Sequence, residues 1–391
     1  MTYKAFLKDA LIEILSVFQF CILIFSYYVF KFFNKKESGV VVGVTEISRL
    51  LYLYGHVIPN AVTVCLSENK LYELKYRFKI SNKNRLTYLF KKLLFAPVLL
   101  GYLSNRYDTF IYLWSTGFIL NRKYDYYFLN KRSKKIVSIF VGDDIRSPIK
   151  LRKILQDIQE DGFIEPYGKQ NPYYLSNSYD NKKIRIAKLS DKYSDVHFSY
   201  PIDQASYLER KQYPTPYIYL KKDLYFSEKK FLNVKKYKLI HAPSNTFIKG
   251  TNFVRKAINS LRDQGYDFEY KELKNVDNKT LIQELRTSHI VLNQFYAFVP
   301  GMLGIEAMAS HCAVLMSADP RIEKNLPQYK KTPWMITKTT EIYHNIKYLF
   351  DNQLEIKSFA DSGYYFVRDN FTEEPVRKYF IETLKKNGVK I

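Results

Sequence analysis

Cysteine is scarce in this sequence. Cys21, Cys65 and Cys312 are the only three among 391 residues, and none belongs to a Cys-x-x-Cys pair or a histidine-rich cluster. This spacing suggests neither a disulfide framework nor a zinc site, and it is typical of a chain that works in a reducing compartment. Internal repeats and low-complexity segments are absent as well.

Acidic residues are the second shortage. The 38 Asp and Glu stand against 61 Lys and Arg, which leaves a formal net charge of +23. Such an excess implies an anionic partner, and nucleic acid, acidic lipid headgroups and phosphorylated small molecules all satisfy it. We find no RNA- or DNA-binding motif and expect no nucleic-acid partner. With 47% hydrophobic residues the chain is globular, and its length suits two domains.

Charge is missing altogether from residues 14–30 (ILSVFQFCILIFSYYVF), which Glu13 precedes and Lys31, Lys35 and Lys36 follow. No small-residue cleavage site follows, which argues against a secretory signal peptide. As a helix this run spans roughly 25 Å, just short of the ~30 Å hydrocarbon core. A single-pass helix with a cytoplasmic Lys flank, a monotopic helix in the interface and a core helix of the first domain all remain open. We expect attachment to the cytoplasmic face of the inner (plasma) membrane.

Acidic residues are also missing from residues 74–100, where seven Lys or Arg alternate with aromatic and aliphatic side chains. A surface of this composition suits an anionic membrane, because each basic residue near such a membrane contributes about 1 kcal/mol. An ordinary helix with a solvated basic face is an equally good interpretation.

Short apolar runs alternate with helical patterns along the rest of the chain. Residues 39–44, 61–66, 108–114 and 136–141 are predicted strands, and residues 182–200 a helix that leads into another strand. A breaker cluster at residues 213–216 precedes a second series, with strands at 237–242, 268–273, 290–294 and 313–317 and helices at 251–264, 278–288 and 301–310. This pattern predicts an α/β fold with two parallel sheets, and a ligand site in the cleft between them.

Residues 300–316 (PGMLGIEAMASHCAVLM) carry the strongest chemical signal. Gly301 opens a helix whose free N–H groups suit phosphate, and Glu306 on that helix can accept hydrogen bonds from a ribose diol. The turn at residues 241–251 (HAPSNTFIKGT) holds Ser244, Asn245, Lys249 and Gly250. A lysine beside a glycine at a helix N-terminus can neutralise a diphosphate. Together the two segments predict a nucleotide-diphosphate site.

These two segments, with the turn at residues 140–148 (FVGDDIRSP), resemble glycosyltransferase family 4, which has the two-domain GT-B architecture. The resemblance runs from about residue 40 to the C-terminus. The apolar run predicts a membrane-associated helix at residues 1–36. The resemblance then implies a Rossmann-like acceptor domain (37–215), a Rossmann-like nucleotide-sugar-binding domain (216–375) and a C-terminal helix (376–391) that packs back on the acceptor domain.

The resemblance also implies residue roles. Glu306 would hold the donor ribose and Lys249 the diphosphate. Backbone N–H groups of Gly301, Met302 and Leu303 would meet phosphate or sugar. Asp144 and Arg146 would face the cleft from the first domain. The donor would be a UDP- or GDP-sugar, and the acceptor would be a glycan or lipid-linked molecule of surface polysaccharide synthesis. The hexosyltransferase-like reaction would retain the anomeric configuration and would need no metal or other cofactor.

Three positions depart from the family pattern. Phe298 stands where many members have the first Glu of a Glu-x7-Glu pair, Thr246 lies where related members often have Arg nearby, and Asp143 replaces the usual Ser. The alternative is therefore a catalytically degenerate protein that serves as a binding subunit of a glycan-assembly complex. The acceptor-activating residue is open. His56 is one candidate, although a structural role suits it better.

Overall fold

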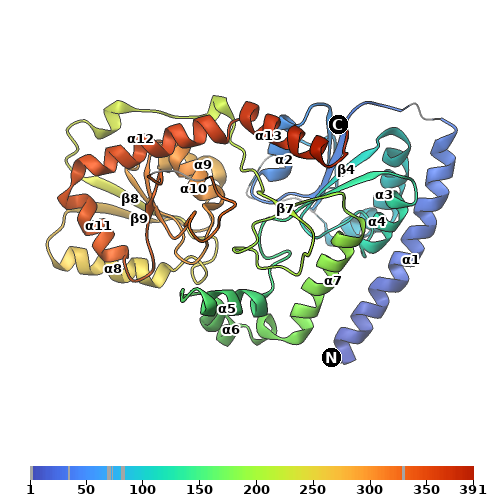
Figure 1. The fold of residues 1–391 in the computed structure, drawn as a ribbon, viewed down its shortest axis with the longest axis horizontal. Coiled ribbons are helices and arrows are strands. Elements are labelled where there is room, and N and C mark those ends of the chain that lie inside the picture. Colours follow the sequence, from blue (N-terminus) through green and yellow to red (C-terminus); the bar gives the residue numbers. More distant parts are fainter. Residues whose placement is uncertain (1–2, 34–35, 68–71, 73, 81–83, 328–330) are drawn as a thin grey trace.

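The computed structural model describes residues 3–33, 36–67, 72, 74–80, 84–327 and 331–391 (Figure 1). Lys35 and Lys83, which belong to the basic segments expected above, lie outside these ranges. The chain forms two α/β units side by side, each built on its own parallel sheet. The α/β fold class with two Rossmann-like sheets and an N-terminal apolar helix is confirmed.

The first unit holds a seven-stranded parallel sheet. Its strand β1 is buried at every position and lies in the middle, between β2 and β4, as expected for a strand covered on both faces. The strands, in spatial order, are β3 (Phe78–Lys79), β2 (Ala61–Ser67), β1 (Val40–Thr45), β4 (Thr109–Leu113), β5 (Lys135–Ile139), β6 (Val196–Phe198) and β7 (Gln212–Tyr213).

Seven helices accompany this sheet among the described residues. Polar residues begin three of them, because the side chains of Asn84, Ser147 and Ser176 accept hydrogen bonds from the first free N–H groups of α3, α5 and α7. The helices are α1 (Tyr3–Lys31), α2 (Leu50–Val57), α3 (Arg85–Arg106), α4 (Lys123–Asn130), α5 (Pro148–Asp157), α6 (Ile164–Gln170) and α7 (Asn177–Tyr193).

The second unit holds a five-stranded parallel sheet in the order β12 (Met335–Ile336), β11 (Ala313–Met316), β10 (Ile290–Leu292), β8 (Tyr237–His241) and β9 (Phe268–Glu272). The chain reaches β8 through a long linker over residues 214–236. The helices of this unit are α8 (Thr251–Asp263), α9 (Asn278–Thr287), α10 (Gly301–Ala309), α11 (Ile342–Asp351) and α12 (Gln353–Asn370).

The C-terminal helix α13 (Glu373–Lys386) crosses back to the first unit (Figure 1). Arg377 donates to the carbonyl of Val57 at 2.8 Å, and the Phe380 ring stacks on Phe198 with centroids 4.9 Å apart. One apolar cluster therefore continues from the first sheet through α13 to α10 and β11 of the second unit. This shared core holds the two units against each other.

Candidate functional site

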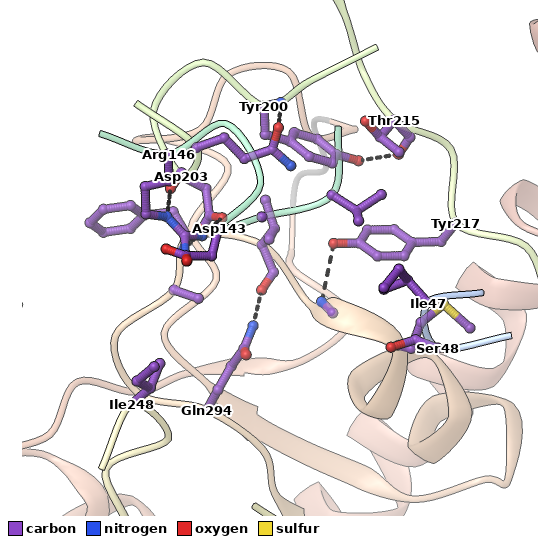
Figure 2. Close-up of a pocket in the computed structure, with 18 of the residues that line it drawn as sticks. Ile47, Ser48, Asp143, Arg146, Tyr200, Asp203, Thr215, Tyr217, Ile248 and Gln294 are labelled. Carbon is purple, nitrogen blue, oxygen red and sulfur yellow. Dashed lines mark hydrogen bonds and ion pairs between the residues drawn. The ribbon is translucent and has the colours of Figure 1, made fainter. Parts of the chain in front are cut away.

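A cavity of about 290 Å³ lies between the two units. Its walls come from the carboxyl ends of strands in both sheets, the position at which open α/β sheets bind ligands. Segments after β1, β4, β5, β6 and β7 meet segments after β8 and β10 there. Figure 2 shows Arg146, Asp143 and Asp203 on one side, Tyr217, Ile47 and Ser48 on the other, and Ile248 and Gln294 on the wall of the second unit.

Lys249 reaches this cavity from the turn after β8. Its ammonium donates to the side-chain oxygen of Gln294, and within the described part of the chain it forms no ion pair. Burial is the main cause that lowers the pKa of Lys249 to about 8; the nearby Asp203 raises this pKa, and Arg146 lowers it. A partly buried cation without a carboxylate partner is suited to an anionic ligand.

The turn that carries Lys249 is held by its own residues. The side chain of Asn245 accepts hydrogen bonds from the N–H groups of Phe247 and Ile248, so it shapes the backbone and does not line the cavity. Ser244 is exposed and also lies outside the cavity lining. Gly250 has φ +74, a conformation that favours glycine, and it begins α8.

The N-terminus of α10 forms another part of the wall, through Gly301 and Met302. Gly301 has φ +65, and its N–H donates to the Tyr217 hydroxyl at 3.2 Å (Figure 2). A phosphate oxygen can replace that neutral hydroxyl as acceptor, because the helix end favours negative charge. Leu303 is partly exposed and does not line the cavity.

Glu306 lies four residues beyond Met302, on the same side of α10, but outside the cavity lining. Its carboxylate accepts a hydrogen bond from the Asn278 side chain at 2.9 Å. Burial raises the pKa of Glu306 to about 7, against the effect of Asn278 and of Arg49. Arg49 comes from the first unit and donates to Asn278 at 3.3 Å, so both units contribute to this second polar cluster.

Arg146 and Asp203 form a buried pair on the first-unit side. The guanidinium donates to the Asp203 carboxylate and to its main-chain oxygen, both at 2.8 Å. The other carboxylate oxygen of Asp203 accepts from the N–H of Phe298 at 2.9 Å, which links the two units across the cavity. Asp203 is therefore the carboxylate that lies beside Phe298, the position at which family 4 enzymes often have Glu.

Asp144 does not face the cavity, contrary to the sequence-based expectation; the cavity is lined by its neighbour Asp143. The Asp144 carboxylate turns back and accepts hydrogen bonds from the N–H groups of Val141 and Gly142. Burial raises its pKa to about 6. His56 also lies outside the cavity lining, where its ring bonds the Tyr52 carbonyl at 2.9 Å.

Sequence reasoning missed five residues of the site: Arg49, Asp203, Tyr217, Asn278 and Gln294. Gln294 is the last residue of the strand predicted at 290–294, and Asp203 lies three residues beyond the segment predicted at 182–200. A position at the carboxyl end of a predicted strand is a usable signal. Arg49, Tyr217 and Asn278 have no such signal, because charged residues, tyrosines and asparagines are common throughout this chain. Among the described residues no group of three or more His, Cys, Asp and Glu is placed to hold a metal ion.

No protein-family model matches this sequence. No curated protein matches it either. Solved structures do match. Anabaena HepE, solved in complex with UDP-glucose, has a TM-score of 0.53 at 10% identity, over 89% of this chain and 100% of that one. Sucrose-phosphate synthase from Thermosynechococcus elongatus has a TM-score of 0.57 at 10% identity, over 89% and 99%. The chain therefore has the GT-B glycosyltransferase fold.

Proposed function

We propose that this protein is a glycosyltransferase of family 4 that moves a sugar from a nucleotide-diphosphate donor to a glycan or lipid-linked acceptor. One observation carries the proposal: Lys249 and the N-terminus of α10 meet at one cavity between the units, and Glu306 lies on the same side of that helix. A cation, a helix N-terminus and a carboxylate in this order match a diphosphate followed by a ribose. UDP-glucose in the similar HepE structure makes a UDP-sugar the first donor to test.

In the proposed reaction the bond between the sugar and the diphosphate breaks, and the leaving diphosphate gains negative charge. The Lys249 ammonium and the Gly301 N–H would stabilise that charge, because both are positioned before the reaction begins. On binding, Lys249 would donate to a phosphate oxygen in place of Gln294, and the Gly301 N–H to a phosphate oxygen in place of Tyr217. Arg146 adds positive potential nearby, although Asp203 neutralises most of it. A retaining outcome without a metal ion belongs to this proposal.

A degenerate GT-B protein that binds without turnover is the second candidate. Phe298 favours it, since its buried ring lines the cavity where a carboxylate often stands in family 4. Asp203 favours the enzyme, because it brings a carboxylate to the Phe298 backbone from the other unit. The two candidates predict the same nucleotide binding and differ in turnover.

The test begins with calorimetric titration of the full chain with UDP, GDP, ADP and CMP, and with their common sugars. Binding of one nucleotide by the wild type, and its loss in both Glu306→Ala and Lys249→Ala, would support the donor site. The sugar form of that nucleotide is then incubated with glycan and lipid-linked acceptors. Sugar transfer supports the enzyme, whereas binding without transfer to any acceptor and without hydrolysis favours the binding subunit. A folded protein that binds no nucleotide would overturn both.

A further inference from the structure

Helix α1 has the reverse of the usual amphipathic pattern. Over residues 7–31 of this helix, the buried positions are Ser16, Gln19, Leu23 and Ser26, and three of these four are polar. The positions exposed between residues 11 and 29 are all apolar or cysteine: Leu11, Ile14, Val17, Phe18, Cys21, Phe25, Tyr28 and Val29. A helix that turns its polar stripe toward the protein and its apolar stripe outward is unsuited to contact with water.

The polar side chains of α1 are bonded to the first unit along much of the helix. Gln19 accepts from the N–H of Leu120 at 2.9 Å and donates to the carbonyls of Lys92 and Leu93. Ser16 accepts from the N–H of Asn121 at 3.0 Å. Near the other end, the Asn105 side chain donates to the Tyr27 carbonyl at 2.9 Å.

These bonds argue against a helix that leaves the protein to span a bilayer. Separation would remove the partners of the Leu120 and Asn121 N–H groups, and would carry Ser16 and Gln19 into hydrocarbon, where unpaired polar groups are costly. The helix–helix contact with α3 is also close, since a Cβ on Gly101 would lie 2.2 Å from the Ser26 hydroxyl oxygen. Helix α1 therefore belongs to the first unit as a docked element.

Helix α3 extends the outward apolar stripe. Its side chains Leu86, Phe90 and Phe95 are each at least 60% exposed. A groove of about 640 Å³ opens beside it, lined mainly by apolar side chains that include Phe95 and Phe30. Two exposed lysines, Lys79 and Lys91, also line this groove. We call the exposed side chains of α1 and α3, with this groove, the α1–α3 face.

Figure 1 shows α1 along the outer edge of the first unit, on the side away from the second. We propose that the α1–α3 face docks this protein on an anionic phospholipid bilayer. Helix α1 lies in the membrane–water interface and does not cross the bilayer. The apolar stripe enters the boundary between headgroups and acyl chains, and lipid chains fill the groove. Lys79 and Lys91 meet lipid phosphates.

Charge selects a bilayer over a second copy of this chain as the occupant. The whole chain carries a formal charge of +23, and residues 74–106, which include α3, contain no acidic residue. Two copies that met through this face would bring like charges together, whereas an anionic bilayer supplies the opposite charge. The inference does not depend on the nucleotide site, so it can fail or succeed independently of the proposed function.

The first experiment measures depth with the natural cysteine Cys21, which is exposed on α1 while Cys65 and Cys312 are buried. The full chain is labelled at Cys21 with an environment-sensitive fluorophore and mixed with vesicles of two parts phosphatidylcholine and one part phosphatidylglycerol. Lipids with a nitroxide near the headgroup should quench the label more than lipids with a deep nitroxide. Stronger quenching by the deep nitroxide would mean that α1 spans the bilayer, and no quenching would mean that it does not meet lipid. Either result overturns the proposal.

The second experiment measures vesicle partitioning by flotation. The double variant Phe18→Ser/Phe25→Ser should weaken partitioning by more than roughly ten-fold, because two exposed apolar rings are lost. The matched control Leu354→Ser, which removes an exposed side chain from α12, should leave it unchanged. Lys79→Gln/Lys91→Gln should weaken it roughly thirty-fold on anionic vesicles, with little effect on neutral ones. Equal binding by all variants would overturn the proposal.

Two further measurements distinguish lost docking from misfolding and from dimerisation. Each variant is first shown to have the circular dichroism spectrum and melting temperature of the wild type, which separates lost docking from lost folding. Sedimentation velocity without vesicles then tests the alternative occupant. A dimer that Phe18→Ser/Phe25→Ser converts to monomer, together with no vesicle binding, would make the α1–α3 face a subunit interface and would overturn the bilayer assignment.

Discussion

Replacing Lys249 by Met should weaken the binding of UDP by about ten- to a hundred-fold while leaving the binding of uridine unchanged. Lys249 contacts the neutral Gln294 oxygen, and burial lowers its pKa from 10.5 to about 8. That lowering corresponds to roughly 3 kcal/mol against the charged form. A diphosphate at the cavity recovers part of this cost through a charge-assisted hydrogen bond, typically about 1.5–3 kcal/mol. Uridine has no phosphate and recovers none of it.

Isothermal titration calorimetry with UDP and uridine measures both affinities on the same protein. Glu306→Gln is the complementary variant, and it should weaken both ligands, because both contain the ribose that Glu306 is proposed to hold. Lys256→Met is the matched control, since Lys256 is an exposed lysine on α8. If Lys249→Met lowers the affinity for uridine as much as that for UDP, the diphosphate assignment of Lys249 is wrong. If it changes neither, the cavity is not the diphosphate site.

The affinity for UDP should rise with pH through about 7 and fall above about 8, because binding needs Glu306 deprotonated and Lys249 protonated. Calorimetry across this pH range measures the affinity. In Glu306→Gln the rise in affinity between acidic pH and about pH 7 should disappear. A wild-type affinity that does not change with pH would contradict the roles of both residues. Asp203→Ala should lower the free energy of unfolding by about 3–5 kcal/mol, since it leaves the buried Arg146 charge unpaired. Urea denaturation measures this free energy. A decrease of less than about 1 kcal/mol would mean that Arg146 and Asp203 contribute no more than a solvent-exposed salt bridge does. Gly250→Ala should lower the free energy of unfolding by about 1–2 kcal/mol, because φ +74 crowds a Cβ. An unchanged melting temperature would refute that reading of the turn.

Much of the fold follows from short-range patterns. The predicted strands at residues 61–66 and 237–242 lie within one residue of β2 and β8 at each end, and the helix predicted at 251–264 differs from α8 by one residue. Buried parallel strands read as continuous apolar runs, so their positions need no knowledge of distant contacts. The predicted helix 301–310 likewise ends one residue beyond α10.

The site was only partly accessible from the sequence. Local signals predict Lys249 and Gly301, because one is a lysine beside a glycine and the other a glycine at a helix start, and both line the cavity. The sequence does not predict that Asp143 rather than Asp144 lines the cavity, because this choice depends on the backbone turn. Here the Asp144 carboxylate accepts hydrogen bonds from the N–H groups of its own turn. The role of each residue remains a prediction.

The sequence alone therefore determined the two α/β series, the cavity-lining segments of the second unit and an N-terminal helix with an uncharged run, because each depends on residues close together in the chain. The tertiary structure decided which units meet and how. It joined Asp203 to Phe298 and Arg49 to Asn278 across the cleft. It also turned the polar stripe of α1 inward through Gln19, whose partners lie about seventy and a hundred residues away. No local pattern encodes such pairings, because they arise only when distant segments pack together.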